Sequence, residues 1–207
     1  HACFIFELIQ GEGGFNVGDK DYLEALMQYC KAHDIAVWDD EIQTFGRTTE
    51  MFAYDVFGLG KYVDVFCVGK MTQACATLFT EAYNPKPGLL SGTFTGETVS
   101  FRTGQALLER LEQGGYYGSD GLFAQHFARF QQEVDALAQR HPEWFPGDLP
   151  SSGGIGGMMR LTPFGGRKEH IVNACKALYD EGVIAFWCGH GAHHIRLLPP
   201  LAVLPLD

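Results

Sequence analysis

Apolar residues along this chain form short unbroken runs that are separated by stretches with helical spacing. Residues 3–9 (CFIFELI) are an apolar run that ends in the glycine loop 10–14 (QGEGG), which is typical of a buried strand opening into a loop. Residues 20–33 place apolar side chains at helical spacing, and residues 35–38 (IAVW) form a second apolar run. A strand, a helix and a strand in this order predict a right-handed βαβ unit.

Two further apolar runs, residues 63–68 (VDVFCV) and 74–79, continue this pattern. We therefore expect the first 80 or so residues to form part of a parallel sheet with covering helices, which is an α/β fold. Sheets of this kind bind ligands at the carboxyl ends of their strands.

The chain changes character after the proline- and glycine-rich stretch 84–92. The pattern predicts helices and then short strands, at about 98–112, 120–140, 157–162, 167–181, 183–188 and 194–198. Helices mixed with short strands predict a small α+β domain, whose boundary with the first part lies between residues 112 and 155. We assign residues 1–112 to a large domain and 113–207 to a linker helix and a C-terminal small domain.

Composition narrows the class of protein. The 207 residues are 46% hydrophobic, which is enough for a packed core and excludes a disordered tail or a coiled coil. The net charge of −10 and the lack of basic clusters argue against binding to nucleic acid or to an anionic membrane surface. No run approaches the ~20 apolar residues of a membrane span.

Six cysteines, none in a C-x-x-C pair, lie in apolar surroundings. They are interpreted as buried free thiols of a reducing compartment, so we expect a cytoplasmic protein.

Charged residues follow two of the predicted strands. Asp40 lies at the end of the second strand and Lys70 at the end of the third, so both should reach one edge of the sheet. An amine buried there can have its pKa lowered enough to act as a nucleophile. A structural ion pair between the two residues is the alternative, and position alone does not decide between them.

Five motifs then point to one family. They are ELIQGEGG (7–14), DEIQTFGRT (40–48), DVFCVGK (64–70), GTFTG (92–96) and RLLPPL (196–201). In this order, and spanning nearly the whole chain, they closely resemble the class III aminotransferases, the pyridoxal-phosphate enzymes that include ornithine, acetylornithine and 4-aminobutyrate aminotransferases. The resemblance implies a fold-type-I transferase, with residues 1–112 as part of its cofactor-binding large domain.

The resemblance also implies roles for single residues. Lys70 would hold the aldehyde of pyridoxal 5'-phosphate as a Schiff base and later shuttle a proton. Asp40 would pair with the pyridine nitrogen and keep it protonated. Gln43 matches a residue near the phenolic oxygen, and Thr93 matches the threonine that binds the phosphate across a dimer interface, so a homodimer is implied.

Two more residues match substrate-binding positions of the family. Arg196 corresponds to an arginine that grips a substrate carboxylate, a task suited to a planar bidentate donor. Glu12 corresponds to a glutamate that covers this arginine when an amine end enters, which predicts a Glu12–Arg196 pair. Arg47 and Glu7 are interpreted as loop-supporting residues.

The implied reaction moves an amino group between an amine or amino acid and a 2-oxo acid. An aminomutase, racemase or decarboxylase would use the same Lys70 and Asp40, because the cofactor performs the difficult step in all of them. A non-catalytic fragment or degenerate paralogue is an alternative of a different class.

The chain departs from the family pattern in several places. A glycine that usually stands between the residues matching Thr44 and Phe45 is missing, Leu8 replaces a common proline, and residues 71–77 lack the usual glycine-rich turn. Family members are also considerably longer. We therefore expect a fragment that lacks the N-terminal half, with its phosphate loop and stacked aromatic ring, and the terminal helix after residue 201.

Two other patterns favour structural interpretations. Cys188, His190, His193 and His194 lie within a few residues, but their spacing is not an established ligand spacing, so no metal site is expected. Phe123, Phe127 and Phe130 fall at i, i+4 and i+7, which is typical of a core stripe.

Overall fold

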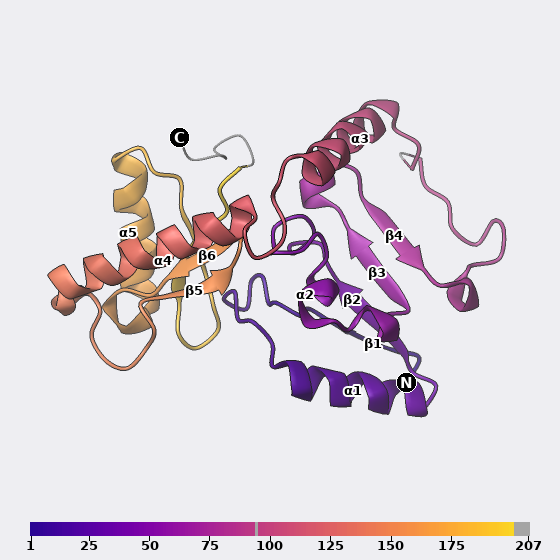
Figure 1. The fold of residues 1–207 in the computed structure, drawn as a ribbon, viewed down its shortest axis with the longest axis horizontal. Coiled ribbons are helices and arrows are strands. Elements are labelled where there is room, and N and C mark those ends of the chain that lie inside the picture. The colour runs from indigo at the N-terminus through magenta and orange to yellow at the C-terminus, as the bar shows by residue number, and fades with distance from the viewer. Residues whose placement is uncertain (94, 201–207) are drawn as a thin grey trace. The chain divides into compact units, whose positions relative to one another are not determined.

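The computed structural model describes residues 1–93 and 95–200, so the motif residues Phe94 and Leu201 lie outside the described residues. The chain divides into two compact units (Figure 1). The first contains His1–Leu8 and Gly18–Tyr116, and the second contains Ile9–Val17 together with the chain from Tyr117 onward. The assignment of 1–112 and 113–207 to a large and a small enzyme domain stays a prediction.

The first unit is built on a four-stranded sheet in the order β1-β2-β3-β4. The strands are β1 (Cys3–Phe6), β2 (Ala36–Asp40), β3 (Val65–Val68) and β4 (Ala76–Phe79), and α1 (Lys20–Ala32) connects the first two. β1, β2 and β3 are parallel, which confirms the predicted strand–helix–strand order.

The expectation that the fourth strand is also parallel is wrong, because β4 pairs with β3 in the antiparallel direction. Only residues 69–75 separate the two strands, and a parallel pair needs a crossover of about a dozen residues or more. The remaining helices of this unit are α2 (Ala53–Phe57), which was not expected, and α3 (Thr98–Gln113).

Helix α1 forms where its sequence provides a cap and an apolar stripe. Asp19 accepts a hydrogen bond from the backbone N–H of Tyr22 (2.8 Å) at its N-terminus, which satisfies one of the free donors there. Leu23, Met27 and Cys30 are its buried side chains, and their spacing gives the apolar face that packs on the sheet.

The second unit has an antiparallel sheet in the order β5-β6-β8-β7. Its elements are α4 (Leu122–Arg140), β5 (Ser152–Ile155), β6 (Met158–Leu161), α5 (Lys168–Asp180), β7 (Phe186–Cys188) and β8 (His194–Leu197). All but β5 were expected from the pattern, and β5 was missed because its residues SGGI carry almost no apolar signal. Ile171, Cys175 and Ile195 form a buried cluster between α5 and the sheet.

The cysteines are only partly as expected. All six are free, but Cys3 and Cys75 are exposed and Cys67 is half-buried, so the expectation that all are buried is wrong. The predicted core stripe of α4 is also only partly buried, because Phe123 is enclosed whereas Phe127 and Phe130 are half-exposed. Across the residues that the structure describes, no helix is long and apolar enough to cross a membrane.

Candidate functional site

In the first unit, the loops that follow β2 and β3 pack against each other. Asp40 and Cys67 are register partners at the ends of these parallel strands. A Cβ atom added at Gly69 would lie 2.4 Å from Cδ1 of Ile42, so a larger residue at this position would have to displace the Ile42 side chain. The structure thus brings the Asp40–Gln43 loop and the Gly69–Lys70 turn together at the carboxyl edge of the sheet, as the sequence predicted.

The Asp40 carboxylate is held through one of its two oxygens. Oδ1 accepts hydrogen bonds from the backbone N–H of Ile42 (3.0 Å) and from the thiol of Cys67 (3.2 Å). Burial, followed by the bond to Asp40, raises the pKa of Cys67 to about 11, so the sulfur keeps its proton and can donate it. No described residue donates to Oδ2, which leaves this oxygen available to a ligand.

Lys70 opens the 3₁₀ turn Lys70–Thr72 directly after β3. Its side chain is exposed, and it forms no ion pair with any residue in the described ranges. The alternative of a structural Asp40–Lys70 ion pair is therefore wrong. The hydroxyl of Thr72, 2.6 Å from the carbonyl oxygens of both Gly69 and Ala74, fixes the turn that presents the amine.

Gln43 is buried in the loop after β2. Nη1 of Arg47 donates to its carbonyl oxygen (2.7 Å), so Arg47 supports this loop as expected, and burial lowers the pKa of the guanidinium. The neighbouring Glu41 is fully buried and accepts hydrogen bonds from the hydroxyl of Thr44 and the backbone N–H of Tyr54. These bonds give the Gln43 loop a defined shape.

Thr93 lies in the exposed segment between β4 and α3. Its hydroxyl has no hydrogen-bond partner in the part of the chain that the structure describes. The structure does not bring Thr93 to the Asp40 and Lys70 loops through any bond, and its phosphate-binding role stays a prediction.

The second unit contains the predicted pair between Glu12 and Arg196, which is confirmed. Nη1 of Arg196, on β8, lies 2.6 Å from Oε1 of Glu12. The arginine side chain is 16% exposed and the glutamate side chain 63%, so the glutamate lies over a largely enclosed guanidinium. The backbone N–H of Gly189 also donates to the Glu12 carbonyl oxygen (2.9 Å).

A second arginine of this unit was not predicted. Arg160 on β6 is the register partner of Arg196, and its Nη1 donates to the carbonyl oxygen of Gly14 and to Oδ1 of Asn16, both at 2.6 Å. Nothing in the sequence pattern marked it, because these partners lie 146 and 144 positions away.

The histidines and the cysteine near β8 lie in the described part of the chain. Within residues 1–93 and 95–200, no three His, Cys, Asp or Glu side chains are grouped so that they could hold a metal ion. His194 instead is buried and has Nδ1 2.8 Å from the hydroxyl of Thr162.

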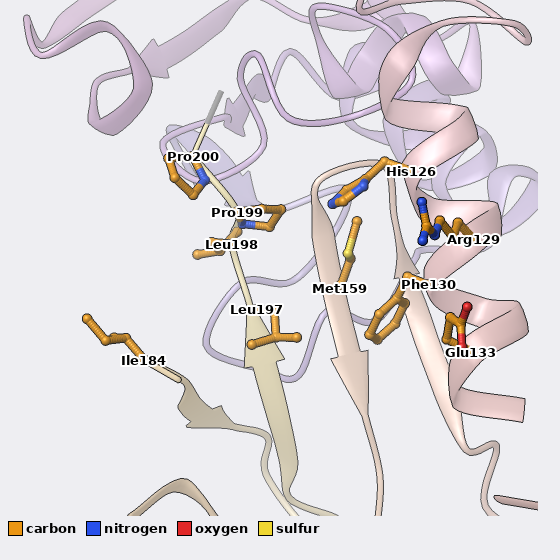
Figure 2. A pocket seen from close by; sticks show the side chains of 10 residues that line it. All are labelled: His126, Arg129, Phe130, Glu133, Met159, Ile184, Leu197, Leu198, Pro199 and Pro200. Atoms are coloured by element: carbon orange, nitrogen blue, oxygen red, sulfur yellow. The ribbon is translucent and has the colours of Figure 1, made fainter. Parts of the chain in front are cut away.

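A pocket of about 580 Å³ lies in the second unit, with α4 on one side and residues Leu197–Pro200 on the other (Figure 2). Its lining is mostly apolar, and it includes Phe130 and Met159. None of the six predicted site residues lines this pocket, so it does not coincide with the predicted chemistry.

The fold, the residues Asp40 and Lys70 of the first unit and the Glu12–Arg196 pair of the second define a class of protein. It is an α/β chain in which a carboxylate and a lysine follow neighbouring parallel strands at one edge of the sheet. More specifically, the chain belongs to the class-III aminotransferase family, whose model matches residues 1–204. The enzymes of this family depend on pyridoxal phosphate.

Several relatives are similar over almost the whole chain. A 4-aminobutyrate aminotransferase from Mycobacterium bovis is 32% identical over 98% of this chain, and an acetylornithine aminotransferase from Agrobacterium fabrum is 30% identical over 97%. The solved structure of a lysine aminotransferase from M. tuberculosis superposes with a TM-score of 0.80 at 28% identity, over 98% of this chain.

These matches cover 46%, 48% and 45% of the respective relatives. The chain therefore spans about half the length of the relatives that it matches.

Proposed function

We propose that this chain carries the lysine-bearing part of a pyridoxal-phosphate-dependent aminotransferase, which moves an amino group between an amine or amino acid and a 2-oxo acid. The observation that carries the proposal is the exposed Lys70, with no ion pair among the described residues, on a loop packed against that of Asp40, whose Oδ2 has no donor there either. Family membership and the names of the relatives support the same reaction class.

The residues of this edge fit the cofactor. Oδ2 of Asp40 would accept the N–H of the pyridine ring, while Ile42 and Cys67 hold Oδ1. A negative charge next to the ring nitrogen stabilises its protonated form. The bound cofactor supplies an electron sink for the bond that breaks at the substrate carbon.

Lys70 has two tasks in this proposal. Its Nζ atom would be the amine that holds the cofactor. The same amine, once free, would move a proton at the reacting carbon of the substrate. Both tasks need an amine that is not tied into an ion pair, which is the state of Lys70.

Gln43 and Thr93 orient the cofactor. Gln43 would lie near the phenolic oxygen, and the hydroxyl of Thr93 would bind the phosphate of the other subunit in a homodimer. The exposure of Thr93 and its lack of a hydrogen-bond partner in the described segments are compatible with a partner outside this chain.

Arg196 binds the carboxylate of the substrate. Its guanidinium presents paired N–H donors that match a carboxylate. Glu12 occupies the guanidinium when an amine end of the substrate approaches instead, because a glutamate that is 63% exposed can be displaced at small cost.

Reductive labelling tests this proposal. The chain is incubated with pyridoxal phosphate, reduced with borohydride and mapped by mass spectrometry. We expect one predominant adduct, on Lys70, which is lost in Lys70→Ala and in Lys70→Arg but kept in the control Lys86→Ala, another exposed lysine of the same unit. An equal low level of labelling on many lysines would contradict the proposal and favour a non-catalytic relative.

A further inference from the structure

Arg160 and Arg196 lie opposite each other on neighbouring strands, yet the proposed function uses only Arg196. Within the described ranges, Arg160 contacts no carboxylate. Its Nη1 binds the carbonyl oxygen of Gly14 and the side-chain oxygen of Asn16, and both belong to the loop that carries Glu12. The guanidinium of Arg160 therefore fixes the backbone of the loop that carries Glu12.

The loop is otherwise closed mainly on itself. Residues Ile9 and Val17 form a β-bridge at its base. The side-chain amide of Asn16 donates to Oε1 of Gln10 and to the carbonyl oxygen of Gly13, both at 3.0 Å. Asn16 holds the loop together through these two bonds. Because Arg160 binds Asn16, its hydrogen bond stabilises the conformation of the whole loop.

Two glycines make room for this arrangement. A Cβ atom at Gly153, the register partner of Arg160 on β5, would lie 2.5 Å from Nε of Arg160. A Cβ atom at Gly14, where φ is +122°, would lie 3.0 Å from Cδ2 of His194. Both the arginine side chain and the loop therefore occupy space that any other residue at these positions would take.

His194 supports the arginine from the other side. Its Nε2 lies 3.3 Å from Nη1 of Arg160, and its Nδ1 lies 2.8 Å from the hydroxyl of Thr162. Burial, followed by the charge of Arg160, lowers the pKa of His194 to about 4. The imidazole is neutral at pH 7 and does not repel the guanidinium.

We propose that Arg160 is a positioning residue that fixes the Glu12 loop, so that Glu12 covers or releases Arg196 by rotating its side chain alone. This rests on the proposed roles of Glu12 and Arg196. Without the tether the loop backbone moves, Glu12 covers Arg196 less often, and substrates that present a carboxylate gain over substrates that present an amine end. Arg160 is thereby a determinant of substrate preference that touches neither substrate nor cofactor.

Hydrogen exchange of the chain tests the positioning directly and needs no cofactor. In Arg160→Met we expect the amides of residues 10–16 to exchange about 10- to 100-fold faster, since two hydrogen bonds from a charged group are lost. Arg160→Lys should restore part of the protection, and Gly153→Ala should mimic the loss by displacing the side chain. The control Arg140→Met, at the exposed end of α4, should change nothing.

Unchanged exchange at residues 10–16 in Arg160→Met would overturn the proposal. So would an equal increase throughout β6, β8 and α5, because Arg160 would then only stabilise the unit as a whole.

Substrate preference is measured on the active enzyme that contains this chain. In Arg160→Met, kcat/KM for carboxylate-presenting substrates should rise relative to amine-ended ones, mainly through KM, and a faster loop with an unchanged ratio would overturn the proposal. Failure of the proposed function is recognised separately, because Arg196→Ala would then leave KM unchanged for every carboxylate substrate.

Discussion

The predicted site residues of the two units differ in whether they have hydrogen-bond or ion-pair partners within their own unit. In the first unit, Lys70 and Oδ2 of Asp40 have no partner among the described residues. In the second, Arg196 binds Glu12 and Arg160 binds the loop beneath it. A group that forms a covalent bond to a cofactor must stay open, whereas a group that selects between substrates can hold a replaceable internal partner. The difference supports chemistry in the first unit and selection in the second.

The two units also differ in the direction in which burial shifts the pKa of an enclosed ionisable side chain. The first encloses Asp39, whose pKa is raised well above its ordinary range by burial and by the charge of Glu41. The second encloses His194, whose pKa is lowered to about 4 by burial and by Arg160. An acid with a raised pKa and a base with a lowered pKa give opposite dependences of stability on pH.

The largest effect is expected from Asp39, which is 0% exposed. Its carboxyl keeps a proton in the folded unit that it loses in the unfolded chain, so the stability present below pH 4 falls as pH rises toward the raised pKa. Hydrogen exchange of the β2 amides measures the urea midpoint of the first unit. We expect this midpoint to be lower at pH 9 than at pH 5. Asp39→Asn should reduce the drop to the part that Glu41 contributes, since burial raises the pKa of that carboxyl too, and the exposed control Asp21→Asn should keep the full drop. Equal midpoints at both pH values in the unsubstituted chain would contradict this.

His194 should give the opposite dependence in the second unit. The unfolded histidine takes up a proton below about pH 6.5 while the folded one stays neutral until about pH 4, so stability present above pH 6.5 is lost as pH falls. The loss is of the order of 3 kcal/mol. Exchange of the β6 amides in urea measures it, with His194→Gln expected to remove the dependence and the exposed His190→Gln to retain it. A second unit that gains stability on acidification would rule out this assignment.

These contrasts show what the sequence could and could not predict. The parallel β1–β2–β3 arrangement and the packing of the Asp40 loop against the Lys70 loop followed from apolar runs and from where the strands end. The direction of β4 did not, because apolar periodicity carries no information about strand direction. The thiol of Cys67 on Asp40 depends on strand register, and the tether from Arg160 joins residues 146 positions apart; neither leaves a local pattern.

Substitution of Asp40 tests whether its free Oδ2 atom binds the cofactor. Replacing it by Asn removes the charge from the ring-nitrogen partner, and a hydrogen bond to a charged group is worth about 1.5–3 kcal/mol. We expect Asp40→Asn to bind pyridoxal phosphate about 10- to 100-fold more weakly in an equilibrium titration. Asp21→Asn serves as the control of equal charge change, and equal affinities of the two variants would remove Asp40 from the cofactor site.

Cys67 provides the smallest and most specific test of the first group, because it acts only through Asp40. Its thiol donates to Oδ1 at 3.2 Å, and losing one such bond costs about 1 kcal/mol. Cys67→Ala should therefore lower the affinity for pyridoxal phosphate about five-fold and shift the pH dependence of the absorbance of the bound cofactor. Cys67→Ser retains a donor and should restore both properties, while the exposed control Cys75→Ala should change neither. If serine were as impaired as alanine, the volume of the side chain and not its hydrogen bond would set the position of Asp40.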